Sequence, residues 1–83
     1  MSLIQLIYVS SATKEMSENE LASILKSSAK NNEEREITGM LLYGQGRFIQ
    51  VLEGESIEVE VLMSRINADP RHSFITIIER NVI

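Results

Sequence analysis

The sequence of 83 residues predicts one α+β domain, a ferredoxin-like sandwich of the βαββαβ type, with both helices packed on one face of the sheet. Three observations predict this fold. Four segments carry the apolar runs of strands, and two carry the apolar repeat of amphipathic helices. These segments follow one another as strand, helix, strand, strand, helix, strand. Only Gly44-Gln45-Gly46 separates the two middle strands, and glycines at that spacing favour a tight hairpin.

The first half of the chain is expected to form a buried strand, a loop and a helix. Residues 3–10 are typical of a strand, and the polar segment Ser11–Met16 follows as a loop. Ser17, with Glu20 three positions later, is a capping box that predicts the start of the helix. We expect this helix to end at Asn31-Asn32, because asparagine tolerates the left-handed conformation. The inward stripe of the helix comprises Leu21, Ile24, Leu25 and Ser28.

The second half is expected to form a hairpin, a second helix and a last strand. Residues 37–43 and 47–53 are the two strands of the hairpin, and residues 73–78 form the last strand. Ser56 is expected to cap the second helix. Asp69-Pro70 ends it, because proline disfavours the helical conformation of the residue before it. The inward positions of this helix include Val59, Leu62 and Ile66.

Two polar side chains lie on the apolar faces of predicted strands. Because side chains alternate along a strand, Tyr8 shares a face with Leu6, and Gln50 shares a face with Leu52. In a ferredoxin-like sheet the first and third strands are neighbours, so this phenol and amide can lie side by side beneath the groove between the helices. Two interpretations are open at this point. The pair either satisfies its own hydrogen bonds in an ordinary core or serves a ligand.

Composition and charge argue against several classes of protein. The formal net charge of −4 argues against binding to the phosphate backbone of nucleic acids. The absence of cysteine removes disulfides and thiolate chemistry, and it fits a reducing compartment. No apolar segment approaches the roughly twenty residues that span a membrane, and the chain does not begin with a signal-peptide pattern. We therefore expect a cytoplasmic domain that binds neither nucleic acid nor membrane.

The sequence contains no recognisable enzyme site. His72 is the only histidine and has no acidic partners at metal-ligand spacing, so no metal site is predicted. Ser10 and Ser11 lack a base and a nucleophile-elbow motif. Asn31 and Asn32 are more informative. One of them suffices to cap the helix, and the other can offer a carboxamide whose donor and acceptor suit a neutral planar heterocycle.

Five segments together carry a family resemblance. They are Leu6-Ile-Tyr-Val-Ser10, Asn31-Asn32, Ile37-Thr-Gly-Met-Leu-Leu-Tyr43, Phe48-Ile-Gln-Val-Leu-Glu-Gly54 and Asp69-Pro-Arg-His72. In order and spacing they closely resemble the BLUF family of blue-light sensors that use flavin. The resemblance covers nearly the whole chain, and five ordered matches are far more specific than any single motif.

The resemblance implies a noncovalently bound flavin between the two helices, usually FAD, with FMN and riboflavin as alternatives. Tyr8 is then the photochemical donor of an electron and a proton, and Gln50 bridges Tyr8 to the ring. Rearrangement of the hydrogen bonds of Gln50 is expected to produce a red-shifted signalling state. Asn32 is implied at the imide side of the ring, Asn31 either there or nearer the ribityl chain, and Ile24 at the apolar face of the ring. The residues implied at the ring carbonyl or the cofactor tail are Arg65, Asp69, Arg71 and His72.

The end of the chain departs from the family pattern. Family members have a further strand that bears a tryptophan or methionine near the glutamine, whereas this sequence stops at Ile83 and contains no tryptophan. The expectation is a C-terminally incomplete domain over residues 1–83, with an unpaired sheet edge that favours a homo-oligomer. An unidentified protein effector is expected to receive the signal.

Three other functions are compatible with the predicted fold. The first is a ferredoxin-like regulatory domain that senses a small molecule without photochemistry. The second is an acylphosphatase-like enzyme, whose arginine and asparagine at a phosphate loop are poorly matched here. The third is an RNA-recognition module, which needs exposed aromatic residues and a basic face that this sequence lacks. The flavin interpretation alone predicts a yellow protein.

Overall fold

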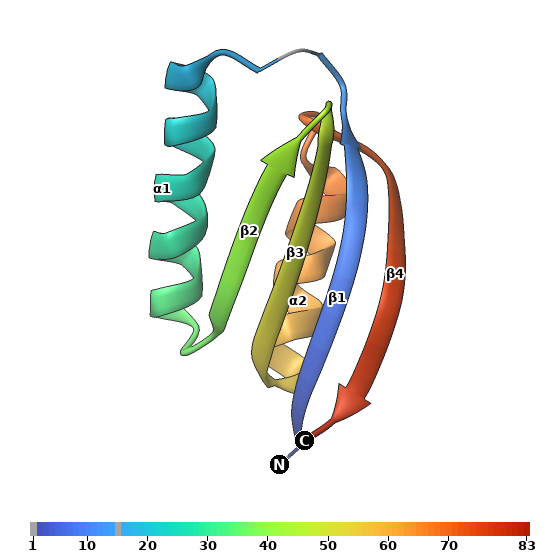
Figure 1. Cartoon of the computed structure of the whole chain (residues 1–83). Helices are drawn as coiled ribbons and strands as arrows, with labels where there is room; N and C mark the ends of the chain where they lie inside the picture. Colours follow the sequence, from blue (N-terminus) through green and yellow to red (C-terminus); the bar gives the residue numbers. More distant parts are fainter. Residues whose placement is uncertain (1, 15) are drawn as a thin grey trace.

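The computed structural model describes residues 2–14 and 16–83 and has the predicted order of elements. The elements are β1 (Leu3–Ala12), α1 (Glu18–Glu34), β2 (Thr38–Gly44), β3 (Arg47–Glu55), α2 (Ser56–Ala68) and β4 (His72–Val82). The strands form one antiparallel sheet in the order β2-β3-β1-β4 (Figure 1). This arrangement confirms the ferredoxin-like α+β fold.

The first and third strands are antiparallel neighbours at the centre of the sheet, as predicted. In their register Leu6 lies opposite Leu52, and Tyr8 lies opposite Gln50. β2 and β4 form the two edges of the sheet. The register therefore brings the phenol and the amide to the same place on neighbouring strands.

Alternation along the central strands separates a buried face from a more exposed one. On β3, for example, Phe48 is fully buried whereas Ile49 is 43% exposed. α2 lies close to β1, β3 and β4, whereas the backbone of α1 lies close to β2 alone among the described elements (Figure 1). The main hydrophobic core comprises Ile4, Leu6, Tyr8, Ile37, Leu52, Val59, Leu62 and Met63. The inward positions predicted for α2 are thus confirmed, and Ile66 packs against this core.

α1 begins where the capping box predicts. The Ser17 hydroxyl accepts a hydrogen bond from the backbone N–H of Glu20 at 3.2 Å. The expected inward stripe is only partly correct. Ile24 is buried, but Leu25 is 42% exposed because α1 rests on an edge strand rather than on the middle of the sheet.

The end of α1 differs from the prediction. The helix continues through Asn31 and Asn32 to Glu34. The residue in the left-handed region is Glu36, with φ of 56°, and the backbone carbonyl of Asn32 accepts a hydrogen bond from the N–H of Ile37 at 2.8 Å. The two asparagine side chains are therefore not used to end the helix and remain available for other contacts.

Local turn and cap chemistry differs from the prediction at two further positions. Gln45 and Gly46 are the turn residues with positive φ, at 52° and 74°, while Gly44 remains in β2. Ser56 is the first residue of α2 rather than its cap. The cap position is Glu55, which forms no side-chain capping bond.

The pairing of β1 with β4 makes both strands longer than expected. Ser11 and Ala12, which the sequence predicts in a loop, continue β1 because they pair with the start of β4, where Ala12 lies opposite His72. β4 likewise extends beyond the predicted residues 73–78 at both ends. Glu15, which belongs to the predicted loop, lies outside the described residues.

Candidate functional site

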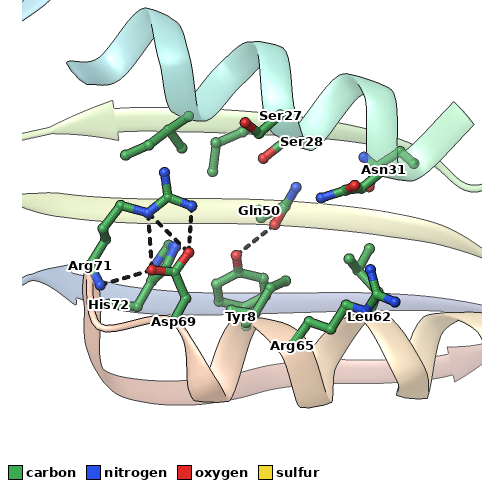
Figure 2. Close-up of a pocket in the computed structure, with 14 residues that line it drawn as sticks. Tyr8, Ser27, Ser28, Asn31, Gln50, Leu62, Arg65, Asp69, Arg71 and His72 are labelled. Carbon is green, nitrogen blue, oxygen red and sulfur yellow. Dashed lines mark hydrogen bonds and ion pairs between the residues drawn. The ribbon is translucent and has the colours of Figure 1, made fainter.

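A groove lies over the buried face of the sheet, between α1 and α2. Its walls come from both helices, all four strands and the turn after α2 (Figure 2). All nine side chains singled out from the sequence line this groove. They are Tyr8, Ile24, Asn31, Asn32, Gln50, Arg65, Asp69, Arg71 and His72. Residues far apart in the sequence thus meet at one place.

Tyr8 and Gln50 form a buried hydrogen-bonded pair in the groove. The hydroxyl of Tyr8 donates to Oε1 of Gln50 at 2.5 Å, and the two residues are 1% and 3% exposed. Burial, with a smaller contribution from the Asp69 carboxylate, raises the pKa of the phenol well above its usual value of 10.0. The phenol therefore keeps its proton and Gln50 is the acceptor. Figure 2 shows the amide nitrogen of Gln50 turned toward α1.

Asn32 carries a buried acceptor without a partner. The residue is 9% exposed, and its Oδ1 has no hydrogen bond to any described residue. An unsatisfied buried polar atom costs about 1–3 kcal/mol. Because this oxygen belongs to a side chain that lines the groove, it indicates a ligand that donates a hydrogen bond there.

The turn between α2 and β4 contributes an ion pair, and the first residue of β4 contributes an imidazole. Arg71 donates to both carboxylate oxygens of Asp69, with 2.5 Å between Nη2 and Oδ2. These hydrogen bonds hold the pKa of Asp69 below its usual 3.8. The pKa of the neighbouring His72 falls below 6.5, chiefly because burial disfavours the charged ring. At neutral pH this corner of the groove holds a balanced pair of charges and a neutral imidazole.

Ile24 and Arg65 face the groove from opposite helices. Ile24, on α1, is 3% exposed and supplies an apolar wall. Arg65, on α2, is exposed and forms no ion pair within residues 2–14 and 16–83. Its guanidinium is available to an acceptor on a bound molecule.

Several lining residues were not assigned to the site from the sequence. They are Ser27, Ser28, Leu41, Leu62 and Ile66. Ser28 is the informative omission, because it occupies an inward position in the stripe of α1, where a hydroxyl is less common than an apolar side chain. Ser27 and Leu41 carry no comparable signal, since their place on the wall depends on how α1 sits against β2.

The groove is narrow. Its free volume is about 70 Å³, well below the ~300–1,000 Å³ typical of ligand pockets. A large planar ligand therefore requires the walls to separate. α1 can move with the loss of fewer packing contacts than α2, because its backbone lies close to one strand whereas α2 lies close to three.

Comparison with known families identifies the class of ligand. The family model BLUF, described as sensors of blue-light using FAD, matches residues 3–83. The chain belongs to the BLUF family. It is therefore a blue-light sensor domain whose cofactor is FAD. This assignment replaces the alternative interpretation, a ferredoxin-like domain that senses a small molecule without photochemistry.

Curated relatives of this BLUF domain are photoactivated adenylate cyclases. The beta subunit from Euglena gracilis is 41% identical over 75 residues, which are 90% of this chain and 9% of the relative. The alpha subunit from the same organism is 46% identical over 70 residues, which are 84% of this chain and 7% of the relative. The chain thus spans less than a tenth of the length of either relative, and it corresponds to a sensory part of them.

Solved structures that share this fold include a BLUF protein and a light-regulated cyclase. The dark state of BlrB, a BLUF protein, is 32% identical with a TM-score of 0.91 and covers 99% of this chain and 62% of its own. A bacterial light-regulated adenylyl cyclase is 40% identical with a TM-score of 0.91, over 95% of this chain and 23% of its own. BlrP1 from Klebsiella pneumoniae is 34% identical with a TM-score of 0.86, and the match covers 95% of this chain and 20% of the BlrP1 chain.

The chemistry of the groove fits a flavin ring. The imide edge of such a ring carries both donors and acceptors, and carboxamides present both. The groove offers two buried amides, Asn32 and Gln50, and the acceptor oxygen of Asn32 has no partner among the described residues. Within the described part of the chain, no cluster of acidic or histidine side chains can hold a metal ion, and neither helix is long and apolar enough to cross a membrane.

Proposed function

We propose that the hydrogen-bonded pair of Tyr8 and Gln50 generates the light signal of this domain. The observation that carries the proposal is the 2.5 Å hydrogen bond from the Tyr8 hydroxyl to Oε1 of Gln50, buried on the wall of the groove. In a buried pair neither side chain has water to replace its partner. A change in the hydrogen bonding of one side chain must therefore change the hydrogen bonding of the other.

Tyr8 is the donor in this proposal. A bound flavin supplies the absorption of blue light and, once excited, the demand for an electron. A phenol that loses an electron becomes a strong acid, and the existing hydrogen bond gives its proton a path toward Oε1 of Gln50. In the dark, the raised pKa of Tyr8 keeps the proton on the phenol. The transfer therefore depends on light.

Gln50 is the switch. Its amide has an acceptor oxygen and a donor nitrogen, so rotation or tautomerisation exchanges what it offers to the groove. A stronger hydrogen bond from Gln50 to a carbonyl at the edge of the cofactor lowers the energy of the absorbing transition. The expected result is a red-shifted signalling state that persists until the amide returns to its dark arrangement.

The other groove residues hold the cofactor. Asn32 accepts a hydrogen bond from the imide side of the ring. The support is that its Oδ1 has no hydrogen-bond partner within residues 2–14 and 16–83. Asn31 assists at that side of the ring or nearer the ribityl chain, and Ile24 covers an apolar face of the ring. The residues assigned to the ring carbonyl or the cofactor tail are Arg65, Asp69, Arg71 and His72.

The domain is proposed to have no catalytic activity of its own and to control a protein effector. The support is that its relatives include photoactivated and light-regulated cyclases, of which it matches less than a quarter. The position of β2 and β4 at the edges of the sheet supports a homo-oligomer. The cysteine-free sequence supports a reducing compartment, and we assign the domain to the cytoplasm.

Absorption spectroscopy tests this function. Protein reconstituted with excess FAD and then desalted should remain yellow, and blue light should shift its flavin band reversibly to longer wavelength. Protein that retains FAD without any light-induced shift would contradict the proposed switch. Colourless protein after desalting would contradict the proposed role of the groove in holding the cofactor.

A further inference from the structure

His72, the only histidine of the chain, lies at the start of β4 near two aromatic rings. Its ring lies edge-on to that of Tyr8, with 6.4 Å between centroids, and 4.6 Å from the ring of Phe48. These two aromatic neighbours limit the orientation of the imidazole. With the ring orientation limited, the imidazole can still differ in which of its two nitrogens carries the proton.

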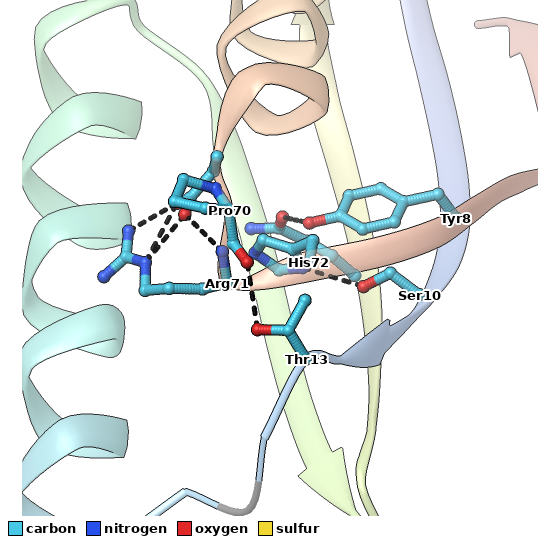
Figure 3. A network of polar contacts seen from close by, with 8 residues as sticks. Tyr8, Ser10, Thr13, Pro70, Arg71 and His72 are labelled. Atoms are coloured by element: carbon cyan, nitrogen blue, oxygen red, sulfur yellow. Dashed lines mark hydrogen bonds and ion pairs between the residues drawn. The ribbon is translucent and has the colours of Figure 1, made fainter.

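Ser10 contacts one of these nitrogens. Its Oγ lies 2.8 Å from Nδ1 of His72 (Figure 3). Ser10 follows Tyr8 by two positions on β1, so it points to the same buried face, and it is 3% exposed. Across residues 2–14 and 16–83, the Ser10 hydroxyl forms no second hydrogen bond.

The surroundings of the Ser10 hydroxyl determine the direction of this bond. A hydroxyl has one proton, and a buried one needs an acceptor. If Nδ1 of His72 carried the ring proton, it would donate to Oγ and leave the hydroxyl proton without an acceptor. If Nδ1 is unprotonated, the hydroxyl donates to it and both groups are satisfied. The second arrangement places the ring proton on Nε2.

The charged groups around the imidazole leave it neutral. Asp69 and Arg71 lie in the turn that precedes His72, but they bind each other at 2.5 Å. β1 presents the phenol of Tyr8 and β3 presents Phe48, and neither is charged at neutral pH. Burial lowers the pKa of His72 below 6.5, and the opposing effect of Asp69 does not restore it.

We propose that Ser10 is a positioning residue, which fixes the neutral Nε2–H tautomer of His72. The wall of the groove at His72 then presents a hydrogen-bond donor. Because Nδ1 is occupied by Ser10, Nε2 is the remaining polar atom of the ring, and as an N–H it only donates. Its partner is an acceptor atom on the flavin ring or its tail. That last step rests on the proposed function, whereas the tautomer does not.

Long-range proton–nitrogen correlation NMR of isotope-labelled protein measures this tautomer. Because His72 is the only histidine, its two ring nitrogens give the only imidazole signals. Above the pKa of the imidazole, the wild-type protein should show a pyridine-type shift for Nδ1 and a pyrrole-type shift for Nε2, with or without FAD. The reverse assignment, or two averaged shifts, would overturn the proposal without the need for any variant.

Variants test whether Ser10 is the cause. In Ser10→Ala the ratio of the two tautomers should move toward Nδ1–H by roughly two- to tenfold, the effect of one net hydrogen bond. Ser10→Thr keeps the hydroxyl and should keep the wild-type signals. Ser73→Ala is the matched control, since Ser73 adjoins His72 in sequence but its hydroxyl donates to the backbone carbonyl of Ser11. Wild-type His72 signals in Ser10→Ala would refute the positioning role.

The tautomer of His72 and the light-induced shift are measured separately, so the role of Ser10 and the Tyr8–Gln50 switch can fail independently. A wild-type protein with the Nε2–H tautomer but no light-induced shift would support the role of Ser10 and contradict the Tyr8–Gln50 switch. A protein with the Nδ1–H tautomer and a normal light-induced shift would contradict the role of Ser10 and leave the switch intact.

Discussion

The side-chain amide of Asn32 on α1 lies against the backbone of Gly39 on β2. A Cβ at position 39 would come within 3.2 Å of Nδ2 of Asn32 and within 2.8 Å of the backbone oxygen of Val51. β2 is also the strand to which the backbone of α1 lies close. The absence of a side chain at Gly39 thus sets how deeply α1 rests on the sheet, and with it the position of the buried acceptor of Asn32.

Gly39→Ala should displace α1 and weaken the binding of FAD. The clash with the backbone of β3 cannot be relieved by a change of rotamer, so we expect a loss of about 1–3 kcal/mol in the free energy of unfolding, as for other overpacked sites. Urea unfolding and titration with FAD measure the two effects. Gly44→Ala is the control, because nothing lies within 4 Å of a Cβ there. Equal effects of the two substitutions would contradict the role of Gly39.

Asn32→Ala should weaken cofactor binding while leaving the flavin-free protein nearly as stable as the wild type. Its Oδ1 has no described partner to lose in the absence of cofactor. A lost buried hydrogen bond to the ring should cost about 1–3 kcal/mol, or roughly ten- to a hundredfold in Kd. Fluorescence quenching during titration with FAD gives this ratio. Asn67→Ala, at an exposed position of α2, is the control; an unchanged Kd for Asn32→Ala would show that Asn32 does not hold the ring.

Gln50→Leu should retain FAD but lose the light-induced red shift. Leucine has comparable bulk and neither donates nor accepts a hydrogen bond. The substitution also leaves the Tyr8 hydroxyl without its acceptor, which should lower the free energy of unfolding by about 1–3 kcal/mol. Gln5→Leu is the matched control, since that amide donates to Glu53 on the opposite face of the sheet. A normal shift in Gln50→Leu would remove this residue from the mechanism.

Acid should destabilise the protein in two steps. The pKa of His72 is below 6.5 in the folded protein, so the unfolded chain takes up its proton first. The contribution of His72 to the free energy of unfolding is therefore fully present above pH 6.5, and it decreases as the pH drops below that value. Asp69, whose pKa Arg71 lowers, adds a second loss below pH 3.8. Urea unfolding over a pH series measures both steps, and His72→Gln should lack the first; the same pH profile in this variant and the wild type would refute a buried neutral imidazole.

The central pair of the site was predictable from the sequence. Period-two alternation placed Tyr8 and Gln50 on apolar faces, and the order of elements limits the sheet to arrangements in which their strands are neighbours. The carboxamides at the end of the first predicted helix indicated Asn31 and Asn32, and the family resemblance indicated the other five residues. All seven line the groove.

Features that depend on long-range contacts were not predictable. Asparagine is a better left-handed residue than glutamate by local propensity, yet α1 runs past Asn32 and Glu36 takes that conformation. Leu25 follows the helical repeat but is exposed, because α1 lies on the edge strand. Ser10 and His72, which are 62 positions apart, meet only through the pairing of β1 with β4.

The light-minus-dark absorption spectrum of Tyr8→Phe, reconstituted with FAD, tests the Tyr8–Gln50 switch most directly. The substitution removes one oxygen and leaves the packing nearly unchanged, while phenylalanine is much harder to oxidise and has no proton to give. The variant should bind FAD, show stronger flavin fluorescence and give no red shift. Tyr43→Phe, whose ring packs on Phe48 with 4.9 Å between centroids and does not line the groove, should keep the shift. A wild-type red shift and dark recovery in Tyr8→Phe would contradict the assignment of Tyr8 as the donor.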